Sequence, residues 1–141
     1  MARAPAPRPF RLRSPVIREH PLQRQIARLL TIEIALPGHA SPFGVWWTSI
    51  DHASPGTIIH ATRARRGVVS GLPDLYIEYH GRAHWIEIKA ADGRLTPGQH
   101  ALGISITACG GRCAVAKDGN EVLALLDAWN VPRHRRTRIA A

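Results

Sequence analysis

The hydrophobic residues in the first part of the chain change from helical spacing to strand spacing. Between Ile17 and about Leu36, apolar side chains recur every three or four positions, which predicts a helix with one apolar face. Pro21 fits the first turn of this helix, because the N–H that proline lacks has no helical partner there. The segment Val45–Ile50, "VWWTSI", is dense in aromatic and β-branched residues and predicts a strand. A short helix is expected from Thr57 to about Arg66.

Two short apolar segments in the middle of the chain predict a β-hairpin. Residues 72–79, "LPDLYIEY", and 83–90, "AHWIEIKA", are strands on this reading, and "HGR" between them forms a tight turn. Charged residues nevertheless stand inside both segments, at Asp74, Glu87 and Lys89. Half-buried strands accommodate charge only where something compensates it, so these three residues call for a chemical explanation.

The remaining elements complete an α/β domain. Thr96 and Pro97 suit the N-cap and first position of a helix that runs to about Ala108. A strand follows in residues 110–117, and a last amphipathic helix in residues 121–130. This order of helices and strands predicts a central mixed β-sheet flanked by helices.

Composition adds a domain plan and a class of partner. The chain of 141 residues has room for one core, which we assign to residues 16–131, between a basic arm at 1–15 and a basic tail at 132–141. Lys and Arg number 19 against 10 Asp and Glu, a net charge of +9 that favours an anionic partner such as nucleic acid. A basic tail that only keeps the protein soluble is the alternative. No apolar run reaches the roughly 18 residues of a membrane span, and no secretory signal is visible, so a cytoplasmic location is expected.

The three charged strand residues predict a cation site. Glu87 and Lys89 are two positions apart, so their side chains lie on one face of the strand, while Ile86 and Ile88 point the other way. If the hairpin forms, Asp74 approaches Glu87, and two neighbouring carboxylates repel unless a cation lies between them. Oxygen ligands of this kind suit Mg²⁺ or Mn²⁺. The alternative is a solvated surface ion pair.

The same residues carry a resemblance to a known family. Pro73-Asp74, Glu87 thirteen positions later and then Lys89 resemble the PD-(D/E)XK nuclease motif. The segment "RRGVVSGLPDLYI…WIEIKAADGRLTPGQ" resembles the VRR-NUC (virus-type replication-repair nuclease) family of that superfamily. The match to G-x-x-x-G-x-P-D and to L-[ST]-x-x-Q includes these further residues: Gly67, Gly71, Leu95, Thr96 and Gln99.

The resemblance implies a restriction-endonuclease-like core and a metal-dependent DNA endonuclease. It makes Asp74, Glu87 and the backbone carbonyl of Ile88 ligands of Mg²⁺ or Mn²⁺, and Lys89 the group that positions water or stabilises charge. It also places Gln99 near the site. Family members carry an acidic residue on the first helix and a glutamine four positions on, and "EHPLQ" offers Glu19 and Gln23 at that spacing. The products implied are a 5′-phosphate and a 3′-hydroxyl.

Several other residues are candidates for contacts with DNA. Four arginines near the motif are expected to hold phosphate, although a solvated helix face explains the first three equally: Arg63, Arg65, Arg66 and Arg94. The arms at Arg8–Arg13 and Arg133–Arg138 would add affinity without sequence preference. Trp46 and Trp47 are neighbours on a strand, so one enters the core and the other is available to a base or a dimer interface. The eight histidines are scattered along the chain, and His52, beside Asp51, is the one to test.

Three functions are compatible with these features. The leading hypothesis is a structure-selective DNA endonuclease of a phage or prophage replication and repair system, working in the bacterial cytoplasm. By analogy with Holliday-junction resolvases, it would cut branched DNA as a homodimer. The second is a nucleic-acid-binding module without catalytic activity, which the intact Asp74, Glu87 and Lys89 disfavour. The third is an interaction protein whose basic arms bind RNA or an acidic protein.

Overall fold

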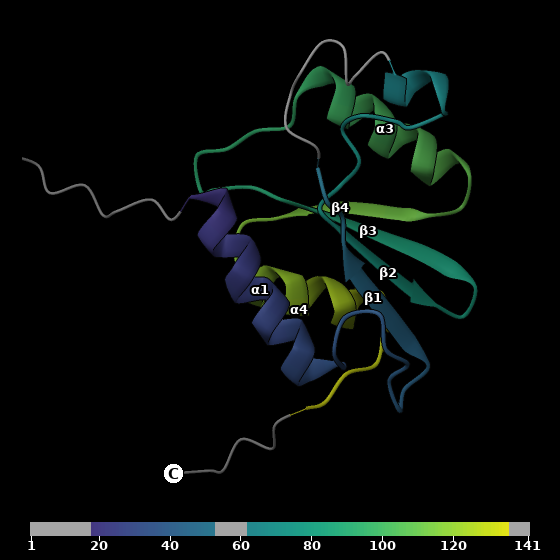
Figure 1. Ribbon diagram of the computed structural model, residues 1–141. Helices are drawn as coiled ribbons and strands as arrows, with labels where there is room; N and C mark the ends of the chain where they lie inside the picture. The colour runs from purple at the N-terminus through teal and green to yellow at the C-terminus, as the bar shows by residue number, and fades with distance from the viewer. Residues whose placement is uncertain (1–17, 53–61, 136–141) are drawn as a thin grey trace, which may run out of the picture.

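The structure is a four-stranded mixed sheet with helices on both faces (Figure 1). It is a computed structural model that describes residues 18–52 and 62–135. The strand order is β1-β2-β3-β4; β1 and β2 pair antiparallel, as do β2 and β3, whereas β3 and β4 are parallel. The elements, in chain order, are α1 (Glu19–Glu33), β1 (Val45–Ser49), β2 (Leu75–Tyr79), β3 (Arg82–Ile88), α3 (Pro97–Ala108), β4 (Arg112–Ala116) and α4 (Gly119–Ala128).

The predicted hairpin is confirmed and fixes the register of the sheet. A two-residue turn joins β2 to β3, with φ of 51° at His80 and 70° at Gly81. Left-handed conformations at both central residues match the twist of the two strands and suit a glycine. Leu75 consequently pairs with Ile86. Asp74, one residue before β2, therefore lies at the end of the sheet where Glu87 is found.

The hydrophobic core fills one face of the sheet, between the strands and the helices α1 and α4 (Figure 1). Alternation along β3 sends Ile86 and Ile88 into this core, where both are buried. Trp47 is fully buried and donates from Nε1 to the carbonyl oxygen of Ala35 at 2.8 Å, while its neighbour Trp46 is 37% exposed. The prediction that the two tryptophans face opposite sides is confirmed.

The helices lie where the sequence predicts, and the bounds of two of them differ: α4 covers Gly119–Ala128 instead of 121–130. α1 covers Glu19–Glu33 instead of 17–36, because the breaker-rich segment after Glu33 ends it early. α3 begins with Thr96 as N-cap, whose hydroxyl accepts from the N–H of Gln99, while the Gln99 side chain accepts from the N–H of Thr96. This capping box confirms the predicted start. Of the helix expected at 57–66, the described part contains one helical turn at 62–65.

Of the two predicted basic arms, the structure describes residues 132–135. Residues 1–15 and 136–141, with Arg8–Arg13 among them, lie outside the described residues. Arg133 is described, and it binds Glu33 and Asp127 at 2.9 Å each. This pairing lowers the pKa of Asp127 through the hydrogen bond from Arg133. Arg133 is thus engaged with acids on α1 and α4 rather than left free for phosphate. None of the described helices has the length and hydrophobicity needed to cross a membrane.

Candidate active site

Asp74 is held by three separate parts of the fold. Its carbonyl oxygen accepts from the N–H of Ile50 at 2.8 Å, which extends the β1–β2 pairing to the end of the sheet. Its carboxylate accepts at Oδ2 from the N–H of Ile88 at 2.7 Å and at Oδ1 from Nε2 of Gln23 at 2.9 Å. The residue is buried, with 7% exposed. The backbone of β3 and a side chain of α1 therefore fix the carboxylate in one orientation.

Glu87 lies on the face of β3 that points away from the core and is also buried. Its Oε1 atom accepts from Nε2 of Gln99 at 2.9 Å and lies 3.1 Å from Nζ of Lys89. Its Oε2 atom is buried, and among the described residues no group donates a hydrogen bond to it. A buried anionic oxygen without a partner costs about 1–3 kcal/mol or more. One lone-pair site of the carboxylate is thus open to a further positive group.

Lys89 connects the two acids contributed by α1 and β3. Its Nζ atom is 3.1 Å from Oε1 of Glu87 and 3.9 Å from Oε1 of Glu19. The backbone N–H of Lys89 donates to the carbonyl oxygen of Ala116 on β4 at 3.0 Å. Lys89 is buried although Glu19 is half-exposed. The ammonium group is therefore positioned at the base of the site, with its charge directed between the carboxylates.

The electrostatics of the site favour binding of a cation. Burial raises the pKa of Asp74, against the opposing effects of the Ile88 amide, His52 and Lys89. Burial also raises the pKa of Glu87, and the negative charge of Asp74 raises it further. Two buried carboxylates that destabilise each other's charged form are stabilised when a cation lies between them.

The residues present fit a hard divalent cation such as Mg²⁺ or Mn²⁺. Asp74 and Glu87 offer carboxylate oxygens, and no described residue donates a hydrogen bond to the buried Oε2 of Glu87. Within residues 18–52 and 62–135, no three His, Cys, Asp or Glu side chains already form a close ligand group. The amides of Gln23 and Gln99 and the ammonium of Lys89 instead hold the other oxygens. Ile88 lies between Glu87 and Lys89, and its N–H already orients Asp74; the metal-binding role of its carbonyl stays a prediction.

Five residues named from the sequence are brought together by the structure. They come from four segments: Glu19 on α1, Asp74 before β2, Glu87 and Lys89 at the end of β3, and Gln99 on the first turn of α3. Two neighbours received no catalytic role from the sequence. Gln23 binds Asp74 across 51 positions of sequence, and Nε2 of His52 lies 3.3 Å from Oδ1 of Asp74. The four-residue spacing between Glu19 and Gln23 was the one sequence signal for Gln23. His52 was a candidate because it follows Asp51, but the sequence gave it no role.

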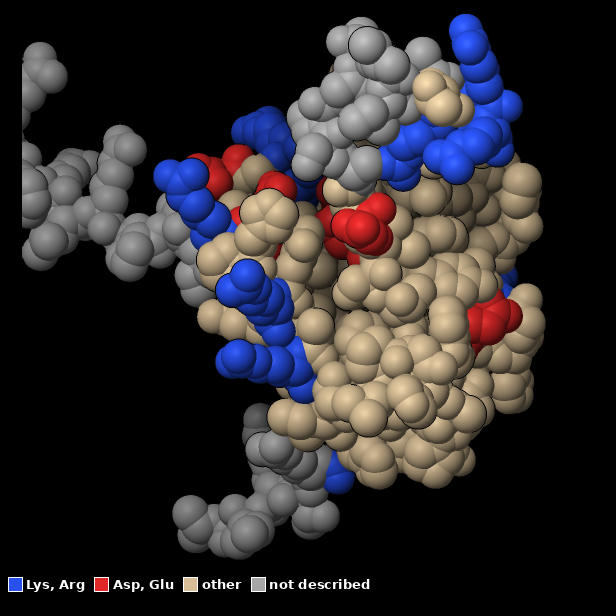
Figure 2. Space-filling model, in the orientation of Figure 1, with Lys and Arg blue, Asp and Glu red and all other residues tan. Residues whose placement is uncertain are grey.

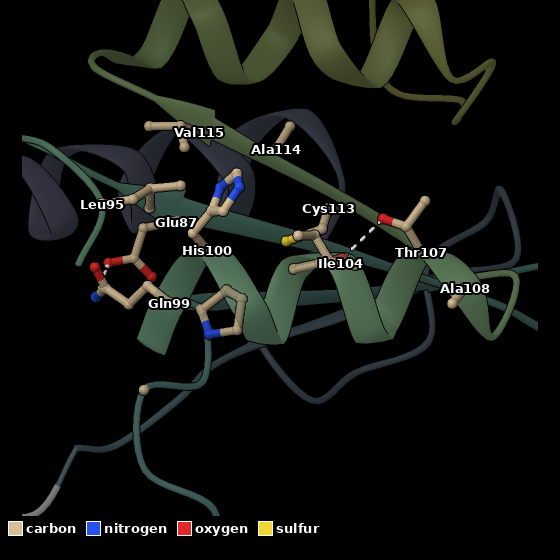
Figure 3. Close-up of a pocket in the computed structure, with 13 residues that line it drawn as sticks. Glu87, Leu95, Gln99, His100, Ile104, Thr107, Ala108, Cys113, Ala114 and Val115 are labelled. Carbon is tan, nitrogen blue, oxygen red and sulfur yellow. Dashed lines mark hydrogen bonds between the residues drawn. The ribbon is translucent and has the colours of Figure 1, made fainter. Parts of the chain in front are cut away.

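A mostly apolar groove of about 500 Å³ leads away from Glu87 along α3 (Figure 3). Glu87 and Gln99 lie at one end, Ile104 and Cys113 in the middle, and Ala108 at the other end. None of the residues of α3 is fully buried, and Ile104 is 59% exposed. The helix therefore covers the face of the sheet that carries Glu87 only loosely and leaves one side of the site open.

The predicted DNA-binding arginines lie on two segments beside the site. Arg63 and Arg65 are on the helical turn at 62–65, and Arg66 follows it. Figure 2 shows basic side chains gathered over this segment and a second group along α1, with acidic groups between them. Arg63 is half-buried and lines a hollow that also contains His52, whereas Arg65, Arg66 and Arg94 are exposed. Their roles in binding DNA stay predictions.

Comparison with known proteins identifies the fold. No protein-family model matches this sequence, and no curated protein matches it. A solved structure described as a "VRR_NUC domain protein" is similar to this chain, with a TM-score of 0.57 and 24% identity. The alignment covers 80% of this chain and 88% of the other. This similarity and the mixed sheet confirm the predicted fold class, an α/β restriction-endonuclease-like core, and they agree with the family resemblance that the motifs indicate.

Proposed function

We propose that this protein is a nuclease of the PD-(D/E)XK type and a member of the VRR-NUC family, which hydrolyses phosphodiester bonds in DNA with Mg²⁺ or Mn²⁺. One observation carries the proposal: Oε2 of Glu87 is buried near Asp74 without a hydrogen-bond donor among the described residues, and Nζ of Lys89 lies 3.1 Å from the other carboxylate oxygen. In a purely structural ion pair, the large majority of buried carboxylate oxygens have a hydrogen-bond partner. The fold shared with a VRR_NUC domain protein supports the same conclusion.

Each residue of the site has a distinct task in this proposal. Asp74, Glu87 and the carbonyl of Ile88 hold the cation, and Glu19 adds a fourth oxygen donor on the exposed side. When bound, the cation lowers the pKa of a water molecule and neutralises charge on the phosphate. Lys89 orients the attacking water and stabilises the charge that develops on the phosphate oxygens. The amides of Gln23 and Gln99 keep the two carboxylates in place.

The reaction is a hydrolysis at phosphorus. The oxygen of water forms a new bond to phosphorus, and the bond from phosphorus to the 3′-oxygen breaks. The attacking water releases a proton to solvent, and the departing 3′-oxygen takes up a proton from solvent, so the products are a 5′-phosphate and a 3′-hydroxyl. Arg63, Arg65, Arg66 and Arg94 hold the phosphates that flank the reacting one.

The substrate we propose is branched or otherwise structured DNA, cut by a homodimer during phage or prophage replication and repair in the bacterial cytoplasm. A dimer would supply two active sites for two symmetric cuts. Figure 2 supports such pairing, because a wide surface over the sheet and α3 is largely free of charge. Exposed apolar side chains occur on these elements as well, at Trp46 on β1 and Ile104 on α3.

Cleavage assays on a panel of DNA structures test the proposal. Four-way junction, flap, single-stranded and duplex DNA are each incubated with the protein in Mg²⁺, in Mn²⁺ and in EDTA. Cleavage that requires a cation is expected for at least one structure. Binding without cleavage of any of them would instead favour a nucleic-acid-binding module without activity.

Substitution of Lys89 separates catalysis from binding. Lys89→Ala is expected to lower the cleavage rate by about 10²-fold or more, because it removes the charge that stabilises the transition state. DNA affinity, measured by fluorescence anisotropy, should remain within about threefold, since phosphate contacts of several arginines supply most of the affinity. Cleavage at the wild-type rate would contradict the role assigned to Lys89. Arg82→Ala serves as the control variant, because Arg82 is exposed and lies at the start of β3, at the opposite end of the strand from Glu87.

A further inference from the structure

His52 occupies a fixed position beside the carboxylates. It follows β1 by three residues, and the N–H of Ile50 donates to the carbonyl oxygen of Asp74 at 2.8 Å. The backbone two residues before His52 is therefore tied to the same residue that the ring approaches. Nε2 of His52 lies 3.3 Å from Oδ1 of Asp74. Pairing at the end of the sheet therefore brings the chain at His52 close to Asp74.

The 3.3 Å between these two atoms, which suits an ion pair, is also compatible with two ligands on one metal ion. Adjacent ligand atoms about 2.1 Å from a six-coordinate ion lie about 3.0 Å apart, close to the distance observed. Oδ1 of Asp74 already accepts from Gln23, but a carboxylate oxygen has a second lone pair. The side chain of His52 is 43% exposed, so water and substrate have access to the same side. His52 also lies within electrostatic range of Glu87.

We propose that His52 binds the divalent cation of the site through Nε2, beside Asp74 and Glu87. This inference rests on the proposed metal-dependent function and goes beyond it by adding a nitrogen ligand to an oxygen site. Imidazole nitrogen suits Mn²⁺ and other first-row transition metals, whereas Mg²⁺ prefers oxygen. The chain is therefore built to prefer Mn²⁺ to Mg²⁺, unlike a site of carboxylates alone.

Electron spin-echo spectroscopy of bound Mn²⁺ tests this ligand directly. The protein is prepared with ¹⁵N-labelled histidine and all other nitrogen as ¹⁴N, so that histidine is distinguished from backbone amides. A ¹⁵N coupling of a directly bound imidazole is expected in the wild type. The coupling should disappear in His52→Asn and persist in His100→Asn, the control, because His100 is on α3 at the Glu87 end of the groove.

Mn²⁺ and Mg²⁺ titrations of the same variants supply the second measurement. His52→Asn should weaken Mn²⁺ binding by about tenfold or more, as loss of a metal-site partner does. It should change Mg²⁺ affinity by less than about threefold, because oxygen ligands dominate there. The half-exposed position of His52 makes the substitution compatible with folding, which circular dichroism checks.

The outcomes separate this inference from the proposed function. Mn²⁺ binding that Asp74→Asn abolishes, without a histidine coupling in the wild type, would overturn the role of His52 and leave the metal site intact. A ¹⁵N coupling that persists in His52→Asn would likewise overturn the role of His52 and leave the metal site intact. Absence of Mn²⁺ and Mg²⁺ binding to the wild type would overturn both the inference and the metal-dependent function.

Discussion

Asp74→Asn should make the metal-free protein more stable while destroying the proposed metal site. The structure gives a specific reason why asparagine is tolerated. Its side-chain oxygen can accept the N–H of Ile88 in place of Oδ2, and its amide can donate to Gln23 once the Gln23 amide is rotated. Both hydrogen bonds survive, and the buried negative charge and its repulsion by Glu87 disappear.

The size of the effect follows from the groups around the carboxylate. The pKa of Asp74 is raised by burial, so its charged form is less favourable in the folded protein than in the unfolded chain. Relief of such a functional-site charge stabilises proteins by about 1 kcal/mol, which corresponds to roughly 3–5 °C in Tm here. Asp74→Ala is the control, because it leaves the buried N–H of Ile88 without an acceptor. That loss costs about 1–3 kcal/mol, so the alanine variant should unfold below the wild type.

Thermal unfolding in EDTA at pH 7, and again with a saturating cation, measures both parts of this prediction. At a concentration 100 times Kd, the cation should stabilise the wild type by about 2.7 kcal/mol and Asp74→Asn very little, so that the order of the two Tm values reverses. The opposite order in EDTA, with Asp74→Asn less stable than the wild type, would refute the reasoning.

The dependence of stability on pH gives a further check on the sign of the Asp74→Asn effect. Because the pKa of Asp74 is raised in the folded state, the penalty for its charge is fully present above that pKa. Protonation relieves the penalty as the pH falls toward the ordinary value of 3.8. The advantage of Asp74→Asn in EDTA should therefore shrink from pH 7 to pH 4. An advantage that grows as the pH falls would mean that another group is responsible.

Two further predictions concern the core and the DNA-binding surface. Trp47→Phe should lower the free energy of unfolding, measured in urea, by about 1–3 kcal/mol, because the carbonyl of Ala35 loses its donor and a cavity forms. Trp46→Ala, on the exposed face, should lower it by less than about 1 kcal/mol. Equal effects would contradict the assignment of the two faces. Arg63→Ala should reduce the slope of log DNA affinity against log salt concentration by about 1, whereas Arg82→Ala, at the start of β3, should leave this slope unchanged. An unaltered slope in Arg63→Ala would show that Arg63 does not contact DNA phosphate.

The parts of the structure that the sequence predicted correctly are those fixed by residues close together in the sequence. The turn at His80-Gly81 fixes the hairpin register, and that register alone carries Asp74 to the end of the sheet beside Glu87. Likewise, Thr96-Pro97 specifies the start of α3. These features depend on residues within one or two short segments. The sequence therefore predicts the part of the site that the hairpin and the start of α3 position.

Contacts between distant segments explain what the sequence did not specify. Gln23 reaches Asp74 only because α1 packs across the end of the sheet, and the two residues are 51 positions apart. His52 approaches Asp74 because the chain beyond β1 continues the pairing through Ile50. Neither contact has a local signature. The same holds for Arg133, whose place in a basic segment hides its pairing with Glu33, 100 positions earlier.

Gln99 shows why a site of this kind needs a neutral amide between the helix and the acids. Its Oε1 accepts from the N–H of Thr96 at the start of α3, and its Nε2 donates to Oε1 of Glu87. Glutamate at this position would complete the same capping box, but it would bring another negative charge to two buried carboxylates. A hydrophobic residue would lose both contacts. Gln99, on the first turn of α3, is thus the residue that orients Glu87, so the loosely packed helix and the proposed metal site are coupled through a single residue.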